Sequence, residues 1–305
     1  MPGLGDPARP HAWEFEAIGA PWRITTATPV EPEVREAIAR RIDEFDRDWS
    51  RFRDDSLVAR IATSPGVFEM PQDAAPLFDL YRRLGDATAG AVSPLVGRRL
   101  EHLGYDRDYS FRPAPGAAAD PAAVPRFDDV AAWDADALTL TTTDPVLIDV
   151  GAAGKGFLVD LVTAHLDQAG HDDYVVDASG DLRHRGDPAT PARVALEHPA
   201  DPSLAIGVIE LANRALCASA VNRRTWGEGL HHVLDARTGL PTADVIATWA
   251  VAPTARAADG IATALFFADP AALDRAFPEL ALEAVRVFAD GGAQYTTNFS
   301  GDLFA

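Results

Sequence analysis

The chain has 305 residues, 47% hydrophobic and 24% charged, which is the composition of a soluble globular protein with a full core. Its 46 acidic residues outnumber the 27 basic ones, and the net charge of −19 argues against a nucleic-acid surface, which needs clustered Lys and Arg. Cys217 is the only cysteine, so internal disulfides and thiolate metal clusters are excluded. A bound metal ion would therefore need oxygen or imidazole ligands.

The N-terminal segment has no positively charged start followed by an apolar run, so we expect no signal peptide. No stretch approaches the roughly 18 consecutive apolar residues of a membrane span. We therefore expect a cytoplasmic protein. Residues 1–12, rich in Pro and Gly, are expected to be loose.

The first half of the chain predicts two strands, two helices and a loop. Residues 13–28 are expected to form the strands, with a turn at 19–21. An amphipathic helix follows, because apolar residues recur at spacings of four and three. Its buried stripe comprises Ile38, Ile42, Phe45, Trp49 and Phe52. A second helix is expected at about 73–86, and the Pro- and Ala-rich residues 110–126 predict a loop or a joint between subdomains.

The middle of the chain predicts a strand, a glycine-rich turn and a helix. Residues 146–150 form a short apolar run that reads as a strand, and the turn covers 151–156. Apolar residues from Phe157 to Leu166 then recur at helical spacing, with Gly170 as the stop. Another strand is expected at 174–177.

The last third alternates short β-type runs and turns over 192–252, including the turn cluster DARTGLP at 235–241. A helix is expected at 255–268, another from Pro270, and a late strand at 284–289. Long helices and many strands in mixed order predict an α+β fold of mixed sheets with packed helices. We expect one main domain over 13–290, built of two closely associated subdomains, and a C-terminal tail at 291–305.

The sequence GAAGKGF joins the predicted strand to its helix and is a candidate anion site. A glycine turn opening a helix directs backbone N–H groups outward, where the helix dipole favours an anion, and Lys155 adds a positive charge. The spacing fits neither a Walker A loop nor GxGxxG. A tight connection with a solvated lysine explains the pattern as well. Asp149 either binds a ligand or caps the loop, and capping is the commoner role.

Asp259 and Thr263 are spaced i, i+4, so a helix places them on one face. Their oxygens suit a hard cation such as Mg²⁺, but two protein ligands need a third group or a phosphate to complete a site. Taken alone, the pair is better explained by an Asp that favours the helix dipole and a Thr bonded to its own i−4 carbonyl.

The segment from His231 to Asp235 contains two adjacent histidines that are candidates for a general base. Neighbouring residues of a strand face opposite sides, so only one of the two can enter a given cleft. A surface or hydrogen-bonded histidine is the commoner explanation. A serine hydrolase is excluded because G-x-S-x-G is absent and Ser219 lacks the flanking glycines.

Taken in order, these pieces resemble the ApbE family, the FAD:protein FMN transferases, from about residue 18 to about 290. IGAPW at 18–22 resembles the opening strand of the family, and SRFRDDS at 50–56 resembles its helix exit. More specific matches follow in GAVSPLVG at 90–97, DVGAAGKGF at 149–157, VDASGDL at 176–182, HHVLDARTGLP at 231–241 and ADGIAT at 258–263.

The resemblance implies a role for each matched residue. Asp259 and Thr263 would bind Mg²⁺ with their side chains, together with the backbone carbonyl of Ala152. Lys155 and Asp149 would contact FAD. Its site would be lined by Leu234 and the segment Ala91, Val92, Ser93. His232 would be the base that activates the acceptor hydroxyl.

The implied reaction attaches the FMN half of FAD to a Thr or Ser hydroxyl of a target protein, and AMP leaves. Ser93 replaces the Asp of the family, Ile18 replaces Met, and Ala220 follows Ser219 where Gly is usual. Two other functions stay open. With water as acceptor the protein would be an FAD pyrophosphatase that yields FMN and AMP, and without turnover it would be a flavin-binding protein.

Overall fold

An eight-stranded antiparallel sheet forms the centre of the molecule. The computed structural model describes residues 10–117 and 121–304. The strand order across the sheet is β1-β2-β6-β7-β10-β15-β16-β17. The bounds of these strands are β1 (His11–Ala17), β2 (Ala20–Thr26), β6 (Tyr174–Asp177), β7 (Asp181–Arg185), β10 (Ala215–Ala220), β15 (Val245–Ala252), β16 (Glu283–Phe288) and β17 (Ala293–Tyr295).

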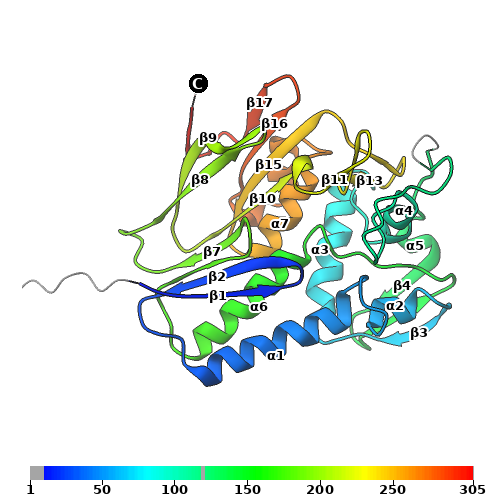
Figure 1. Ribbon diagram of the computed structural model, residues 1–305, viewed down its shortest axis with the longest axis horizontal. Coiled ribbons are helices and arrows are strands. Elements are labelled where there is room, and N and C mark those ends of the chain that lie inside the picture. The colour runs from blue at the N-terminus through cyan, green and yellow to red at the C-terminus, as the bar shows by residue number, and fades with distance from the viewer. Residues whose placement is uncertain (1–9, 118–120, 305) are drawn as a thin grey trace, which may run out of the picture.

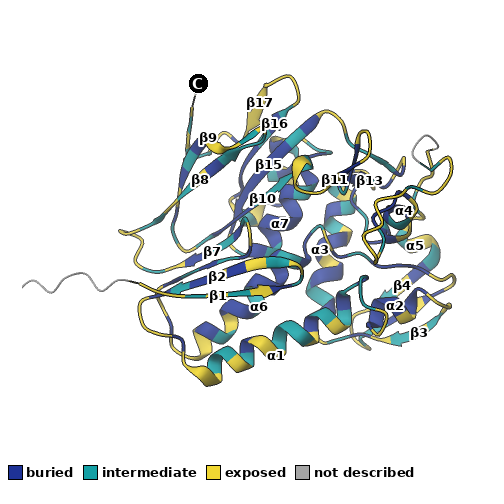
Figure 2. Cartoon of the chain, viewed as in Figure 1, coloured by how far each residue is buried: buried dark blue, intermediate teal, exposed yellow. Residues whose placement is uncertain are grey.

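Helices cover one face of this sheet (Figure 1). The long ones are α1 (Pro32–Trp49), α3 (Ala74–Ala87), α6 (Gly154–Gln168) and α7 (Ala255–Ala264). Shorter helices are α2 (Leu57–Ile61), α4 (Gly97–His102), α5 (Phe127–Val130), α8 (Pro270–Ala276) and the 3₁₀ turns η1 (Val221–Arg223) and η2 (Pro278–Leu280). Helix α7 is packed between the sheet and the other helices, and it is buried along almost its whole length (Figure 2). Side chains that point from it can therefore reach only the core or an internal cavity.

A smaller sheet packs on the opposite face. It has the order β18-β9-β8, with β8 (Ala192–His198), β9 (Asp201–Leu211) and β18 (Asp302–Leu303). The period-two alternation of strand side chains separates the two cores. In β10, Cys217 belongs to the core under the helices, whereas its neighbour Leu216 joins Leu196 and Trp249 in the core under β8 and β9.

Three peripheral sheets complete the fold. One has the order β3-β5-β4, and two are hairpins. Their strands are β3 (Gly66–Glu69), β4 (Ala131–Asp134), β5 (Thr139–Thr142), β11 (Thr225–Trp226), β12 (Leu230–His231), β13 (Leu234–Asp235) and β14 (Leu240–Pro241). The architecture confirms the predicted α+β class. Within the described residues, no helix combines the length and hydropathy needed to cross a membrane.

Most predicted elements of the first half are present. The strands, both helices and the stop at Gly170 (φ +85°) are confirmed. The turn predicted at 19–21 lies at 18–19, and Phe52, predicted in the stripe of the first helix, lies beyond its end at Trp49. The predicted strand at 146–150 is wrong. These residues are mostly buried, but they pair with no strand among the described residues, and the N–H of Asp149 donates to the carbonyl of Pro94 instead. The run is apolar because these residues are buried in the core, and an extended segment can be buried without pairing to a strand.

Some boundaries differ from the prediction. The helix predicted to reach residue 268 ends at Ala264, because the N–H groups of Phe266 and Phe267 bond to the carbonyls three residues back and tighten the chain into turns. The segment predicted as a tail, 291–305, contributes β17 and β18. Of the predicted loose N-terminus, residues 1–9 lie outside the described part, as do 118–120 of the predicted joint at 110–126. The rest of that joint contains no helix or strand.

Candidate active site

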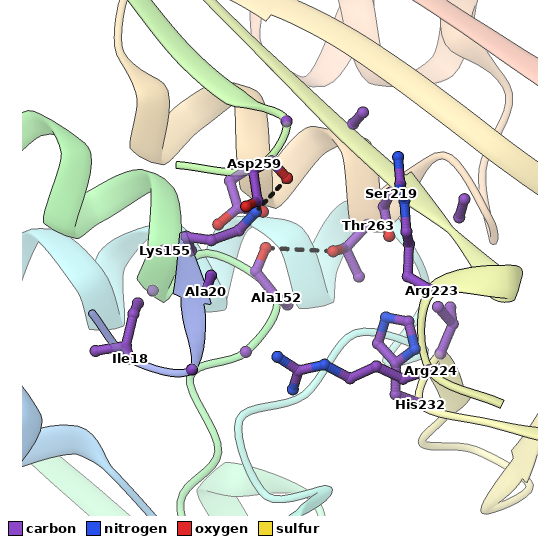
Figure 3. Close-up of a pocket in the computed structure, with 18 of the residues that line it drawn as sticks. Ile18, Ala20, Ala152, Lys155, Ser219, Arg223, Arg224, His232, Asp259 and Thr263 are labelled. Atoms are coloured by element: carbon purple, nitrogen blue, oxygen red, sulfur yellow. Dashed lines mark hydrogen bonds between the residues drawn. The ribbon is translucent and has the colours of Figure 1, made fainter. Parts of the chain in front are cut away.

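One large cavity, with a volume of about 1040 Å³, opens between the helical layer and the two sheets. Nine of the ten residues singled out from the sequence line it: Val92, Ser93, Asp149, Ala152, Lys155, His232, Leu234, Asp259 and Thr263. The tenth, Ala91, is fully buried behind the wall, where its carbonyl accepts the N–H of Ala236. Figure 3 shows Lys155, Asp259, Ala152 and Thr263 on one side of the cavity and His232 with Arg224 on another.

The glycine-rich turn forms the cavity floor before α6 begins at Gly154. The carbonyl of Val150 accepts the N–H groups of Ala153 and Gly154. The hydroxyl of Tyr81 accepts the N–H of Ala152 at 3.2 Å and donates to the carbonyl of Asp149 at 3.4 Å. Tyr81 thereby holds the turn so that the carbonyl of Ala152 is directed to Thr263.

Three oxygen-bearing groups meet where the turn passes α7. The hydroxyl of Thr263 donates to the carbonyl of Ala152 at 3.3 Å. One helical turn earlier, Asp259 accepts the N–H of Gly156 at 2.9 Å and is 6% exposed. Burial raises the pKa of Asp259 well above its ordinary value, and the nearby Asp181 adds to this rise. A buried carboxylate beside a carbonyl and a hydroxyl is a donor set that a hard cation would stabilise.

No group of three or more His, Cys, Asp or Glu suitable for a metal occurs among the described residues. A cation at Asp259 would therefore depend on the Ala152 carbonyl, the Thr263 hydroxyl and oxygens of a substrate. This fits Mg²⁺, which typically takes one or two carboxylates and substrate phosphates rather than an all-protein cage. The three groups thus fit the predicted metal site.

Lys155 reaches across the first turn of α6 to the loop between β6 and β7. Its ammonium donates to the carbonyls of Ala178 at 2.9 Å and Ser179 at 3.2 Å, and it lies 3.4 Å from Asp181. Burial alone would lower the Lys155 pKa, but the charges of Asp181 and Asp259 outweigh burial, so the net shift is upward. The lysine is therefore charged and held at the cavity wall, which excludes the solvated lysine left open by the sequence.

Asp149 is held by a buried arginine and also caps the turn. Arg51, 2% exposed, donates from Nε to Asp149 at 2.6 Å. The other carboxylate oxygen accepts the N–H of Gly151 at 2.7 Å. The guanidinium of Arg51 stacks over Phe52 and Tyr105, and its Nη2 has no hydrogen-bond partner among the described residues. Asp149 therefore has the capping role that its position in the sequence favoured, and it also lines the cavity.

The two adjacent histidines diverge as strand geometry predicts. His231, in β12, donates from Nε2 to the carbonyl of Thr242 at 2.8 Å and accepts the N–H of Val233 at Nδ1. His232 follows the strand and lines the cavity, and its buried Nδ1 has no partner among the described residues. Burial lowers the pKa of His232 to about 4, with the positive charge of Arg224 acting in the same direction. His232 is therefore neutral near pH 7, which is the form that accepts a proton.

This depressed pKa predicts a specific pH dependence of stability. The unfolded chain takes up the proton below the ordinary pKa of 6.5, whereas the folded chain does so only near 4. The contribution of His232 is therefore complete above about pH 6.5 and is lost as the pH falls toward 4, by roughly 2 kcal/mol between about pH 7 and about pH 4.5. Urea unfolding of His232→Gln at these two pH values should show a smaller loss than the unchanged protein. Equal losses would contradict this assignment.

Ser93 lines the cavity, as do the apolar Val92 and Leu234. The hydroxyl of Ser93 accepts the N–H of Leu95 at 3.2 Å, so the Ser that stands in place of the family's Asp is engaged with its own turn. Ile18 lines another wall and sits in the β1–β2 turn at φ +46°. Positive φ is strained for a β-branched residue, and such strain is concentrated at functional sites.

Four site residues were missed by sequence reasoning: Arg51, Tyr81, Asp181 and Arg224. Arg51 and Asp181 stand inside matched motifs, so the motifs were the available signal, but neither spacing indicates a partner. Arg224 contacts the hydroxyl of Tyr105, and this contact holds it beside His232. These contacts join residues far apart in the chain, and no local pattern predicts them.

Comparison with known proteins identifies the family and the fold. The model of the ApbE family matches residues 18–285. The FAD:protein FMN transferase of Escherichia coli K12 is 26% identical over 98% of this chain and 88% of its own length. The ApbE protein of Thermotoga maritima has a similar structure, with a TM-score of 0.80, 23% identity and coverage of 95% of this chain and 97% of the other. The flavin transferase ApbE of Vibrio cholerae gives a TM-score of 0.78 at 22% identity, covering 96% and 99%. With a family model spanning most of its length and the same fold, this chain belongs to the ApbE family.

Proposed function

We propose that this protein is an FAD:protein FMN transferase that uses a divalent cation, Mg²⁺ in the first instance. It would move the FMN half of FAD to a Thr or Ser hydroxyl of an acceptor protein and release AMP. The observation that carries the proposal is the arrangement of Asp259, Thr263, the Ala152 carbonyl, Lys155 and His232 around one cavity. The proposal is also supported by relatives such as the Escherichia coli protein, which is named FAD:protein FMN transferase.

The proposed site assigns a task to each side chain. Asp259, Thr263 and the Ala152 carbonyl would hold the cation, which supplies neutralisation of the charge that builds on the pyrophosphate. Lys155 contributes a second fixed positive charge on the same wall, and burial strengthens its effect. Arg51 holds the Asp149 carboxylate at the cavity wall through its Nε and would act on FAD through that position.

His232 is the proposed general base. As the acceptor oxygen forms its bond to the FMN-side phosphorus, the bond to the AMP oxygen breaks, and the acceptor proton passes to the imidazole. A base with a pKa near 4 is a weak proton acceptor, but the negative pyrophosphate raises the pKa of a nearby imidazole when it binds. Neutral His232 is thus available before substrate enters, and its basicity increases in the complex.

Turnover of FAD by the purified protein tests the proposal directly. With Mg²⁺ we expect AMP release, and with a suitable acceptor we expect a covalent FMN adduct detected by mass. EDTA should abolish both. Free FMN in place of an adduct, with every acceptor tried, would assign the protein as an FAD pyrophosphatase. FAD binding without AMP under any metal would exclude both enzymes and leave a flavin-binding protein.

A further inference from the structure

The smaller sheet ends in a strand whose outer edge borders the cavity. In the order β18-β9-β8, strand β8 has a neighbour on one side only. Three of its residues, Val194, Ala195 and Glu197, line the same cavity as Lys155 and His232. β8 and β9 lie over the part of the main sheet that contains β10 and β15 (Figure 1). The part of this strand edge between Val194 and Glu197 therefore borders the space in which the proposed reaction takes place.

The pairing of β9 shows which backbone groups of β8 point to this edge. The N–H of Phe304 donates to the carbonyl of Ile206 at 2.7 Å, so Ile206 directs its backbone groups toward β18. The ladder to β18 continues with Leu303 opposite Gly207 and Asp302 opposite Val208, so Val208 directs its backbone groups toward β18 as Ile206 does. Ala195 pairs with Val208 on the other side, before the register shift at Glu197, and therefore turns its N–H and C=O away from β9 and toward the open edge.

The opposite wall of this groove is the end of β10. Strand β10 pairs with β15 as far as Ala220, but its register with β7 ends at Cys217. Ser219 and Ala220 continue past that point and line the cavity. The groove between β8 and β10 is lined by the small residues Ala195, Ser219 and Ala220 beside the larger Val194 and Glu197. The small residues allow the backbone of another chain to approach closely.

Two contacts close one end of the groove. Arg223 forms an ion pair with Glu197 at 3.0 Å, and the side-chain amide of Asn222 donates to the carbonyl of Pro199 at 2.6 Å. They tie the end of β8 to η1, which directly precedes Arg224 and lies beside it in the cavity wall (Figure 3). The free edge of β8 is therefore held at a fixed position relative to His232 and Arg224.

We propose that the edge of β8 is the docking strand for the acceptor protein. An extended acceptor segment would add to the smaller sheet as a further strand and so deliver its Ser or Thr hydroxyl to the cavity. Strand addition provides affinity through main-chain hydrogen bonds and depends little on sequence. The cavity volume, at the upper limit of a site for one small molecule, provides room for this segment beside FAD. The inference rests on the proposed transferase function.

Proline substitutions at two positions of the same edge test the proposal. Ala195→Pro removes an N–H that points to the groove and leaves the ladder to β9 intact, because edge strands tolerate proline on their open side. Arg193→Pro is the matched control: it lies two residues away on the same edge but outside the cavity lining. The candidate probes are short synthetic peptides, each with one Thr in a β-forming background. The peptide used for the test is one that the unchanged enzyme modifies.

We expect Ala195→Pro to raise the KM for this peptide by about tenfold or more. FAD affinity should stay unchanged, and Arg193→Pro should behave as the unchanged enzyme does. In a second experiment, single peptide bonds of the probe are N-methylated one at a time. Methylation should raise the KM at every second residue, because only alternate N–H groups of the added strand point to β8. This second arm uses the unchanged enzyme, so it decides the matter even if Ala195→Pro folds poorly.

Three outcomes overturn the proposal. Equal KM values for both variants and for all N-methylated probes would exclude strand addition. Loss of FAD affinity in Ala195→Pro would show that the edge binds the flavin rather than the acceptor. AMP release with no modified peptide in the set would assign water as the acceptor. Absence of AMP release from FAD with Mg²⁺ is a different result, because it removes the proposed function itself.

Discussion

Replacing Asp259 with Asn is expected to reduce Mg²⁺-dependent AMP release from FAD by about a thousandfold, because a transition-state charge loses several kcal/mol of stabilisation. The substitution keeps the shape of the side chain and retains an oxygen for the N–H of Gly156. It removes the only carboxylate among the three groups that would hold the cation. We therefore expect the fold to persist and the concentration of Mg²⁺ needed for half-maximal activity to rise steeply. AMP release measured across a Mg²⁺ titration gives both quantities.

Asp160→Asn is the matched control for this experiment. Asp160 lies on α6 and accepts the N–H groups of Ala255 and Arg256 at 2.8 and 2.9 Å, at the N-terminus of the same helix that carries Asp259. The negative charge of Asp160 interacts favourably with the dipole of α7, so removing this charge should cost about 1 kcal/mol of stability. It does not line the cavity, and turnover per folded molecule should stay near that of the unchanged protein. If Asp259→Asn is no more impaired than Asp160→Asn, the cation does not bind at Asp259.

Local patterns predicted the elements that carry the site but not the contacts between them. The stripe through Ile38, Phe45 and Trp49 identifies α1 because helical spacing is a property of neighbouring residues. The turn GAAGKGF and the i, i+4 pair on α7 were also visible in the sequence. The turn and the pair meet through the hydrogen bond from the Thr263 hydroxyl to the Ala152 carbonyl, and these two residues are 111 positions apart in the sequence. Only the family resemblance indicated it.

The misread segments share a physical cause. The apolar run from Val146 to Val150 was interpreted as a strand, since a buried strand and a buried extended chain have the same composition. Arg51 escaped notice because its partner, Asp149, is 98 residues away. Buried charges need partners, so a buried arginine implies a carboxylate, but its position depends on the tertiary fold. For the same reason the sequence left the choice between His231 and His232 to the family resemblance.

Gly156→Ala is expected to destabilise the protein by about 2 kcal/mol or more and to reduce turnover as well, because α6 lies against the backbone of α7 at this glycine. A Cβ built here would lie 2.2 Å from the carbonyl oxygen of Ala255 and 2.6 Å from the Cβ of Asp259. Both are fixed parts of α7, so the helix must move. Alanine favours a helix by about 1 kcal/mol over glycine, but overpacking a core costs about 1–3 kcal/mol or more, and here the obstacle is backbone.

The shift of α7 also links stability to chemistry. The N–H of Gly156 donates to Asp259, so moving α7 away from α6 lengthens this bond and displaces the Asp259 carboxylate and the Thr263 hydroxyl from the Ala152 carbonyl. Gly85→Ala in α3 is the control, since a Cβ there meets its nearest atom, the carbonyl oxygen of Val92, at an ordinary 3.5 Å. Thermal unfolding should show a lower Tm for Gly156→Ala only, and addition of Mg²⁺ with FAD should raise the Tm of Gly85→Ala but not that of Gly156→Ala. Equal Tm values for the two variants would mean that α6 and α7 are not in close contact at Gly156.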